Sequence, residues 1–337
     1  MKTYKIAIVG AGAVANLHAG AIKALDCAEL AAVVDVVHEN AEAFGARHCC
    51  LPYSDLEIML DVEKPDAVIL AVPTFLHCEY VERCGAKGVN VLCEKPVEMD
   101  LGRARKLIKS AETYGISLMI AQVVRFWQGY TDVKAMYDSG ALGDVMMAYC
   151  HRSSTVPARG GWIIDPELGR GAIQDMHIHD VDFLEYLFGQ AETVYTLAVK
   201  DYTGCFDHSF SSFTFPNGVK GVAECSFATK NSYPFTTFMR ICGTKATVEY
   251  SYRAGVSDTK AVQNTGMTIF RDNEPPVAVA LDEYDPYARQ LEYFLNCVET
   301  GAAPEIVPHV DCLRNIAMLD AVRESAESGK VVEIEKI

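Results

Sequence analysis

The sequence predicts an α/β protein of two domains: an N-terminal doubly wound parallel sheet, and a C-terminal α+β domain with a large, mostly antiparallel open sheet. A chain of 337 residues is too long for one typical core. Short apolar runs alternate with helical patterns in the first third of the chain, which is typical of a parallel sheet covered by helices. Hairpin-linked strand patterns follow. We therefore expect domains at residues 1–123 and 124–337.

The composition excludes several classes of protein. Half of the residues are hydrophobic and 22% are charged, as in ordinary globular proteins. The net charge of -15 argues against a nucleic-acid partner, because a phosphate backbone requires a basic surface. No apolar run approaches the roughly 18 residues of a membrane span, so we expect no membrane partner. The 12 scattered cysteines lack a C-x-x-C pair, and Met1 leads straight into a strand pattern, so a cytoplasmic location without a secretory signal is expected.

A glycine-rich loop follows the first predicted strand, Tyr4–Val9. Gly10, Gly12 and Ala15 have G-x-G-x-x-A spacing. In such a loop the first glycine permits the tight turn, and the second lets the backbone approach a pyrophosphate. The third small residue lets the next helix pack close to the strand. An ordinary βαβ turn without a ligand is the alternative, but the ordered strand, loop and helix favour dinucleotide binding.

The elements after the loop predict how the dinucleotide is held. A helix at about 14–24 points its free N–H groups and positive dipole end at the phosphates, with Ala13 and Val14 at its start. The next apolar run, Leu30–Val34, ends in Asp35, which is placed to accept hydrogen bonds from the ribose hydroxyls. A carboxylate repels a 2′-phosphate and two valines follow it, so NAD is favoured over NADP.

The remainder of the first domain continues the alternation. Helices are expected at 40–47, 56–60 with Ser54 as N-cap, 77–87 and 101–114, and strands at 67–72, 89–93 and 117–122. The ends of parallel strands line the ligand crevice of such a sheet. The expected cofactor contacts at these strand ends are Pro73, Thr74, His77, Glu94, Lys95 and Gln122.

The second domain is predicted to contain a sheet interrupted by one helix. Strands are expected at 145–153, 192–201, 207–215, 221–229, 235–242 and 245–252, and helices at 131–139, 171–187, 286–299 and 309–328. Asn217-Gly218 is a hairpin signal between two of the strands.

Lys95 is the first candidate for chemistry, because it follows a predicted parallel strand and precedes Pro96. This position places its amine in the crevice where a nicotinamide would lie. A lysine orients a hydroxyl oxygen or exchanges a proton when burial lowers its pKa, whereas the neighbouring Glu94 acts in the opposite direction. A surface lysine in a turn is the alternative interpretation.

The helix at 171–187 carries the second group of candidates. Asp175, His179 and Asp182 have i, i+4 and i+7 spacing and share one helix face. A histidine beside a carboxylate can act as a general base for an alcohol, although a capped helix start with a satisfied histidine is the alternative. His177 and His179 form H-x-H, but residues two apart on a helix point about 200° apart, so no metal site is expected.

Two further side chains are candidates for a polyol pocket. Arg152 follows His151 on the first strand of the second domain, and Trp162 lies in the Gly160-Gly161 loop. An arginine fits hydroxyl or carboxylate groups and a tryptophan fits a sugar face. Packing in the core is the alternative for both.

Four motifs in order give the chain a family resemblance: GAGAVANLH at 10–18, AVPTFLH at 71–77, EKP at 94–96 and GRGAIQDMHIHDVD at 169–182. Over essentially its whole length the chain resembles the Gfo/Idh/MocA oxidoreductases, which include glucose–fructose oxidoreductase and inositol dehydrogenase. The resemblance implies that Lys95, Asp175 and His179 face the nicotinamide and the substrate carbon. It also implies a Lys–Pro bond that is often cis, and homodimers or homotetramers formed through the open face of the second sheet.

The chain departs from the family pattern at two positions. It has Gly169-Arg170-Gly171 where the family usually has three glycines, and His177 where the family commonly has glycine. These departures bear on the helix start, the pocket shape and the choice of substrate.

Together these observations predict an NAD-dependent oxidoreductase acting on a sugar, polyol or related hydroxyl compound. His179 would take the hydroxyl proton, Lys95 would hold the same oxygen, and Asp175 would orient the pair, while the cofactor carries the redox step. Two alternatives stay open: an NAD-dependent glycosidase of the same family, and a dinucleotide-binding regulator without chemistry. The sequence does not name the substrate.

Overall fold

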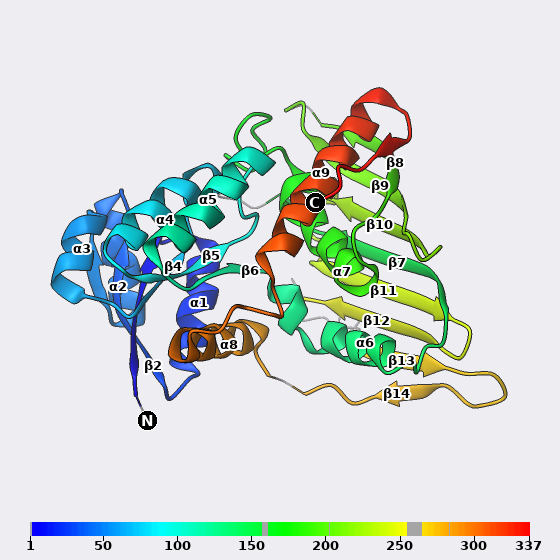
Figure 1. The fold of residues 1–337 in the computed structure, drawn as a ribbon, viewed down its shortest axis with the longest axis horizontal. Helices are drawn as coiled ribbons and strands as arrows, with labels where there is room; N and C mark the ends of the chain where they lie inside the picture. The colour runs from blue at the N-terminus through cyan, green and yellow to red at the C-terminus, as the bar shows by residue number, and fades with distance from the viewer. Residues whose placement is uncertain (1, 157–160, 202, 255–264, 283) are drawn as a thin grey trace. The chain divides into compact units, whose positions relative to one another are not determined.

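The computed structural model describes residues 2–156, 161–201, 203–254, 265–282 and 284–337. These form two compact units, Met1–Phe126 with Tyr284–Cys312, and Trp127–Glu283 with Leu313–Ile337 (Figure 1). The sequence places residues 284–312 in the second domain, whereas they pack with the first unit. Among the described residues, no helix combines the length and the apolarity that crossing a bilayer requires.

The first unit contains a six-stranded sheet in the order β3-β2-β1-β4-β5-β6, with every pair parallel. Its strands are β1 (Tyr4–Val9), β2 (Ala28–Val34), β3 (Leu51–Tyr53), β4 (Ala67–Leu70), β5 (Asn90–Glu94) and β6 (Leu118–Ala121). This order confirms the predicted doubly wound sheet. The edge strand β3 was not predicted, because its three residues are largely exposed and include Pro52.

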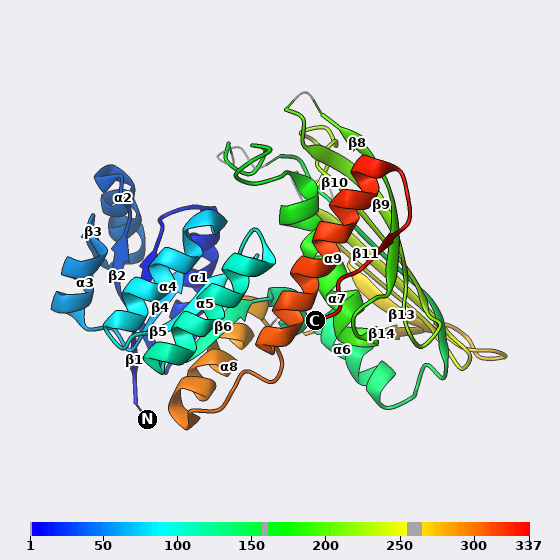
Figure 2. The same ribbon diagram turned by 45° about the horizontal axis from the view of Figure 1, so that its top comes forward.

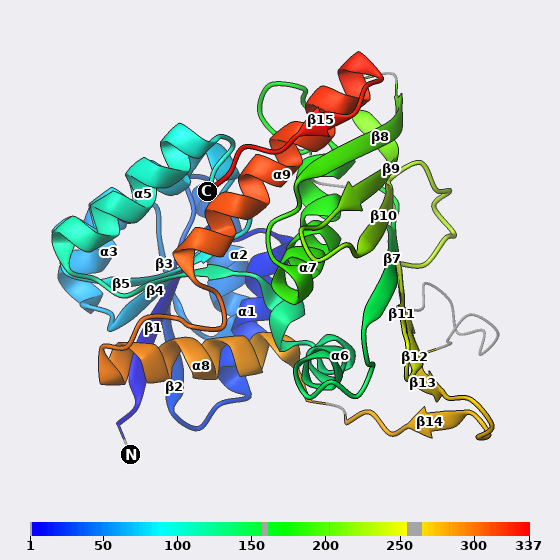
Figure 3. The same ribbon diagram turned by 45° about the vertical axis from the view of Figure 1, so that its right-hand side comes forward.

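Helices cover both faces of this sheet. They are α1 (Ala13–Lys23), α2 (His38–His48), α3 (Leu56–Glu63), α4 (His77–Ala86), α5 (Leu101–Tyr114) and α8 (Pro286–Thr300). Helices α4 and α5 pack together on one face, and α1 and α8 pack together on the other (Figure 3). The packing of α8 on α1 explains why residues 284–312 belong to the first unit.

The predicted N-cap of α3 was wrong by one residue. Asp55, not Ser54, is the cap, and its Oδ1 accepts a hydrogen bond from the backbone N–H of Ile58 at 2.8 Å. The Ser54 hydroxyl instead lies 2.9 Å from Nδ1 of His38.

The second unit contains a nine-stranded sheet in the order β14-β13-β12-β11-β7-β10-β9-β8-β15. Its strands are β7 (Val145–Ser153), β8 (Thr193–Lys200), β9 (Phe206–Thr214), β10 (Lys220–Ser226), β11 (Thr236–Gly243), β12 (Thr247–Arg253), β13 (Gly266–Phe270), β14 (Val277–Val279) and β15 (Val332–Glu333). All pairs are antiparallel except β7 with β10, so the mostly antiparallel sheet is confirmed. Asn217 and Gly218, with a Gly218 φ of +87°, form the predicted turn between β9 and β10. The three shortest outer strands, β13, β14 and β15, were not predicted.

One face of the second sheet is covered and the other is open. Helices α6 (Gln128–Asp138), α7 (Ile178–Phe188) and α9 (His309–Ser328) lie on one side, and no described helix lies on the other (Figures 2 and 3). The open side carries exposed apolar side chains, including Tyr195, Leu197 and Phe210.

An acidic pair lies at the turn between β8 and β9. Asp207 is 7% exposed, and burial together with the nearby Asp201 carboxylate raises its pKa to about 6. In the unfolded chain this carboxyl group has an ordinary pKa of 3.8. The folded state therefore binds the proton more tightly, and its stability falls as the pH rises from 3.8 through 6.

We expect Asp207→Asn to stabilise the protein above pH 6, because the amide cannot ionise beside Asp201. The gain at pH 8 should be about 1–3 kcal/mol, the scale of a shift of roughly two pKa units. Urea unfolding at pH 4 and pH 8 would measure it, with little difference expected at pH 4. Equal effects at both pH values would contradict the ionisation argument.

Candidate active site

The glycine loop has the geometry that dinucleotide binding requires. Gly10 has a φ of +96°, and a Cβ there would collide with the Ala71 carbonyl at the end of β4, so only glycine fits. Gly12 is exposed, and a Cβ built on it would have no atom within 4 Å. Gly12 has no side chain to cap α1, so the N–H groups of the first turn, which begins with Ala13 and Val14, are left without a side-chain cap and suit an anion. Ala15 is fully buried, as close packing of α1 requires.

Asp35 lies at the end of β2 and contacts the same loop. Its Oδ2 accepts a hydrogen bond from the Ala11 N–H at 2.9 Å, and its Oδ1 accepts one from the Val37 N–H at 2.9 Å. Oδ1 also accepts a long hydrogen bond from Nδ2 of Asn40, at 3.5 Å. The residue is half-buried, and its Oδ2 can accept a further hydrogen bond. The residues therefore fit a ribose diol beside a pyrophosphate.

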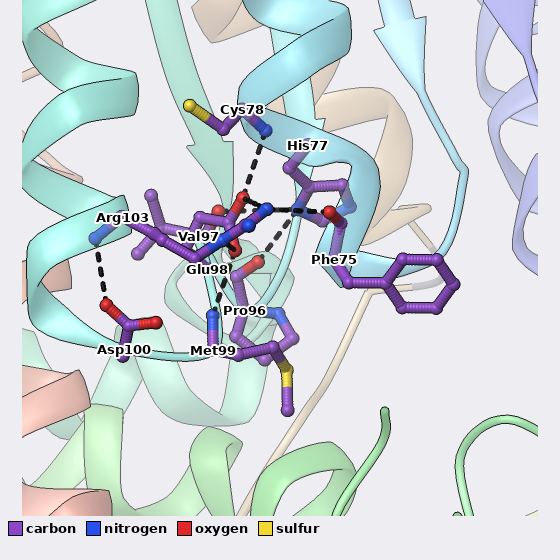
Figure 4. A network of polar contacts seen from close by, with 9 residues as sticks. All are labelled: Phe75, His77, Cys78, Pro96, Val97, Glu98, Met99, Asp100 and Arg103. Carbon is purple, nitrogen blue, oxygen red and sulfur yellow. Dashed lines mark hydrogen bonds and ion pairs between the residues drawn. The ribbon is translucent and has the colours of Figure 1, made fainter. Parts of the chain in front are cut away.

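His77 joins the segments that follow β4 and β5. Its ring is buried, and Nδ1 lies 3.0 Å from the Pro96 carbonyl oxygen (Figure 4). Nε2 lies 3.1 Å from the carbonyl oxygen of Val72. Burial lowers the pKa of His77. Both ring nitrogens face backbone carbonyls, and a neutral imidazole donates a hydrogen bond to one of them, so the side chain links these segments. The predicted contact of His77 with the cofactor stays a prediction.

A buried carboxylate, Glu98, holds the same segments from the other side. It accepts hydrogen bonds from the N–H groups of Cys78 and Met99, each at 3.1 Å, and from Nε and Nη2 of Arg103, each at 2.9 Å. Nη2 of Arg103 also donates to the Phe75 carbonyl at 2.7 Å (Figure 4). Sequence reasoning did not single out this ion pair. Its signal was an acidic residue two positions after the EKP segment, with an arginine five positions later.

Lys95 is presented by this buried framework. Its bond to Pro96 is cis, as the family resemblance implies, and Lys95 is half-buried between the buried residues Glu94 and Pro96. Its backbone N–H donates to Oε2 of Glu94 at 3.1 Å. Oε1 of Glu94 lies 2.7 Å from Nε2 of the buried His18, so the Glu94 side chain also links β5 to α1.

The remaining predicted cofactor residues lie at the same strand ends. Pro73 is half-buried and precedes the buried Thr74, which begins the 3₁₀ turn η1 (Thr74–Leu76). Gln122 follows β6 and is 2% exposed. Among the residues that the structure describes, its Oε1 has no hydrogen-bond partner, which leaves an acceptor for a donor such as a carboxamide.

In the second unit, the predicted single helix begins with a π-helical segment, η3 (Ile173–His177), before α7. From Gly171 to Glu185 only Asp175 and His179 are partly exposed. Asp182 is fully buried, so the predicted three-residue face is reduced to two. π-helical segments are frequent at functional sites, where they redirect side chains.

The two histidines of the H-x-H pattern have different surroundings. His177 is fully buried with Nε2 2.9 Å from the Ser211 hydroxyl, and burial lowers its pKa to about 3. His179 is half-buried. Within the described part of the chain, no three His, Cys, Asp or Glu side chains are grouped as metal ligands would be.

The glycine pattern before η3 has a steric cause. A Cβ at Gly169 would collide with the Trp162 carbonyl, and Gly171 has a φ of +73° with Cys205 close to where its Cβ would lie. Arg170, which replaces the middle glycine of the family pattern, adopts a left-handed φ of +60°. The turn is therefore retained although Arg170 stands where the family has its middle glycine.

The prediction that Arg152 contacts substrate needs correction. Its guanidinium is buried and pairs with both carboxylate oxygens of Asp180, at 3.1 Å and 3.0 Å, and donates to the Tyr130 hydroxyl at 2.9 Å. These contacts engage the Arg152 guanidinium in the interior of the second unit. Trp162 is half-buried, and Gly160 of its loop lies outside the described residues.

Comparison with known proteins gives this arrangement a family. Residues 4–122 match the model "Oxidoreductase family, NAD-binding Rossmann fold", and residues 130–249 match the "GFO/IDH/MocA C-terminal domain". The chain belongs to the Gfo/Idh/MocA family. This family consists of NAD(P)-dependent oxidoreductases, so the predicted class of enzyme and cofactor is confirmed.

Several known proteins match this chain along most of their own length. A D-xylose 1-dehydrogenase (NADP(+)) from Haloferax volcanii is 29% identical over 84% of this chain and 85% of its own. An inositol 2-dehydrogenase from Rhizobium meliloti is 28% identical over 98% and 99%. The crystal structure of aldose-aldose oxidoreductase from Caulobacter crescentus has the same fold, with a TM-score of 0.86 at 23% identity over 99% of this chain and all of that one.

We expect Arg152→Met to destabilise the second unit by about 3–5 kcal/mol, because it leaves the Asp180 carboxylate buried without its cation. The double variant Arg152→Met/Asp180→Leu should recover most of this loss, since removing both charges is often neutral. Urea unfolding would measure both variants. A loss of substrate affinity without a loss of stability in Arg152→Met would restore the substrate-binding role.

Proposed function

We propose that this chain is an NAD-dependent dehydrogenase or reductase acting on a CH–OH carbon of a sugar or polyol. The observation that supports it best is Lys95, held half-buried at the carboxyl end of β5 by the buried contacts of His77 and Glu98. The relatives named after xylose and inositol support the substrate class.

The proposal gives each of three side chains a role. The bound nicotinamide supplies the carbon that accepts or donates hydride. His179 takes the hydroxyl proton, Lys95 donates a hydrogen bond to the same oxygen, and Asp175 orients the pair. Their half-buried state suits this work, because each side chain can reach a substrate while its backbone is fixed by buried neighbours.

We also propose NAD rather than NADP as the cofactor, a cytoplasmic location, and a homodimer or homotetramer. The Asp35 carboxylate supports NAD, since it would repel a 2′-phosphate. The exposed apolar side chains on the open face of the second sheet support self-association.

The first test removes the two proposed catalytic groups. Lys95→Ala and His179→Ala should each lower kcat by about 10²–10⁴-fold with a sugar or polyol, because both groups act on the reacting hydroxyl. NADH affinity should change less than about threefold. NADH absorbance and fluorescence would measure the two quantities, and Lys87→Ala, an exposed lysine paired with Asp61, is the control.

Three results would decide against the proposal. Unchanged turnover in both variants removes the mechanism. Release of an aryl glycoside's leaving group without net NADH change would identify a glycosidase. Dinucleotide binding without turnover on any polyol would identify a regulator.

The second test addresses the cofactor. Asp35→Asn should reduce the preference for NAD over NADP by about tenfold, since the amide keeps an acceptor for the loop but removes the repulsion of a 2′-phosphate. The ratio of kcat/KM for the two cofactors would measure it. An unchanged ratio would show that another group selects the cofactor.

A further inference from the structure

Glu94, the last residue of β5, carries a nearly buried carboxylate whose two oxygens are both occupied. Its side chain is 9% exposed, and that of His18 is fully buried. Nε2 of His18 lies 2.7 Å from one oxygen, and the Lys95 N–H donates to the other at 3.1 Å. A carboxylate can accept both bonds. The hydrogen of the first bond is assigned to Nε2 of His18, because Nδ1 of that ring is buried without a hydrogen-bond partner among the described residues.

Glu98, four residues later, shows a different arrangement. Its carboxylate pairs with Nε and Nη2 of Arg103, a permanent cation, which compensates its charge. In the described structure the hydrogen-bond partners of the Glu94 carboxylate are an imidazole and a backbone amide. Neither of these is a permanent cation such as the one that Arg103 supplies to Glu98.

We propose that Glu94, held by His18, sets the relative affinity for the two redox forms of the cofactor in favour of NAD⁺. The inference rests on the proposed function, because it requires nicotinamide at the carboxyl edge of the sheet, where Glu94 lies. The oxidised ring carries a positive charge and the reduced ring is neutral. A carboxylate fixed at this edge therefore stabilises the oxidised form selectively. The charge of Lys95 is the same in both complexes and does not cancel this difference.

Packing within the first unit holds the His18 ring that contacts the carboxylate. His18 lies in α1, and its ring meets that of Tyr287 from α8 edge-on, with centroids 5.3 Å apart. Two helices and β5 thus fix one carboxylate, which makes His18 and Tyr287 positioning residues.

The test is the ratio of dissociation constants, Kd(NAD⁺)/Kd(NADH), measured by titration calorimetry without substrate. Glu94→Gln should raise the ratio on the order of tenfold, through weaker NAD⁺ binding, the scale of one charge acting at an effective dielectric constant of about 20. A purely structural role would weaken both redox forms equally and leave the ratio unchanged.

The chain offers a matched control. The Glu63 side chain is 10% exposed and pairs with Nζ of Lys5 at 2.7 Å, at the amino end of β1. Glu63→Gln removes the same charge at the opposite edge of the sheet and should leave the ratio unchanged. His18→Gln keeps a hydrogen-bond donor without altering charge and should also leave it unchanged.

A second variant covers the case in which Glu94→Gln does not fold. His18→Phe/Glu94→Met removes the whole pair while keeping a ring against Tyr287, and the same increase in the ratio is expected. An unchanged ratio in a folded variant that binds both forms overturns the inference. Tighter NAD⁺ binding in His18→Gln would reveal a charged imidazole and also overturn it. A wild-type protein that binds neither form would instead overturn the proposed function.

Discussion

The buried carboxylate of Glu98 is the constraint on which the cofactor half of the candidate site depends. It joins the N-terminus of α4 to the segment after β5 and, through Arg103, to the start of α5 (Figure 4). An unpaired buried carboxylate would be costly, so the Arg103 contacts and the two backbone N–H bonds must form together. This requirement fixes the path of the chain on both sides of β5, and therefore the place where Lys95 leaves the interior.

The two units present their candidate groups in the same way. Lys95 is the half-buried residue in a buried run at the end of β5, and Asp175 and His179 are the half-buried residues in a buried run through η3 and α7. A polar group set in such a run cannot drift, because moving its backbone would disturb the packing on every side. This arrangement fixes the backbone of each reactive side chain and so limits the orientations that the side chain can adopt.

Much of this could be predicted from the sequence. The strand before Gly10, the helix after it and Asp35 obey local rules of turn geometry and periodicity, and the structure follows them. The segments that were not predicted correctly depend on contacts with residues far away in the sequence. The short strands β3 and β15 exist because longer neighbours pair with them, and α8 belongs to the first unit because it packs on α1. No local pattern carries that information.

The error at Arg152 was avoidable in part. In β7, period-two alternation places it on the face of Ala148 and Cys150, which are buried, while Tyr149 and His151 are partly exposed. That pattern predicts a buried arginine, which needs a carboxylate partner, and Asp180 stood in the motif already recognised. The residue type suggested a substrate contact, but the periodicity indicated the core.

The H-x-H pair shows how burial supports the assignment of the general base. Both imidazoles lie in the same stretch of chain, and the family resemblance points to His179, because the family commonly has glycine at the position of His177. His177 is sealed against Ser211, and burial lowers its pKa to about 3, so at neutral pH it has almost no tendency to take a proton. Efficient proton transfer requires a base whose pKa lies near the working pH. Of the two histidines, only the half-buried His179 can therefore serve the proposed reaction.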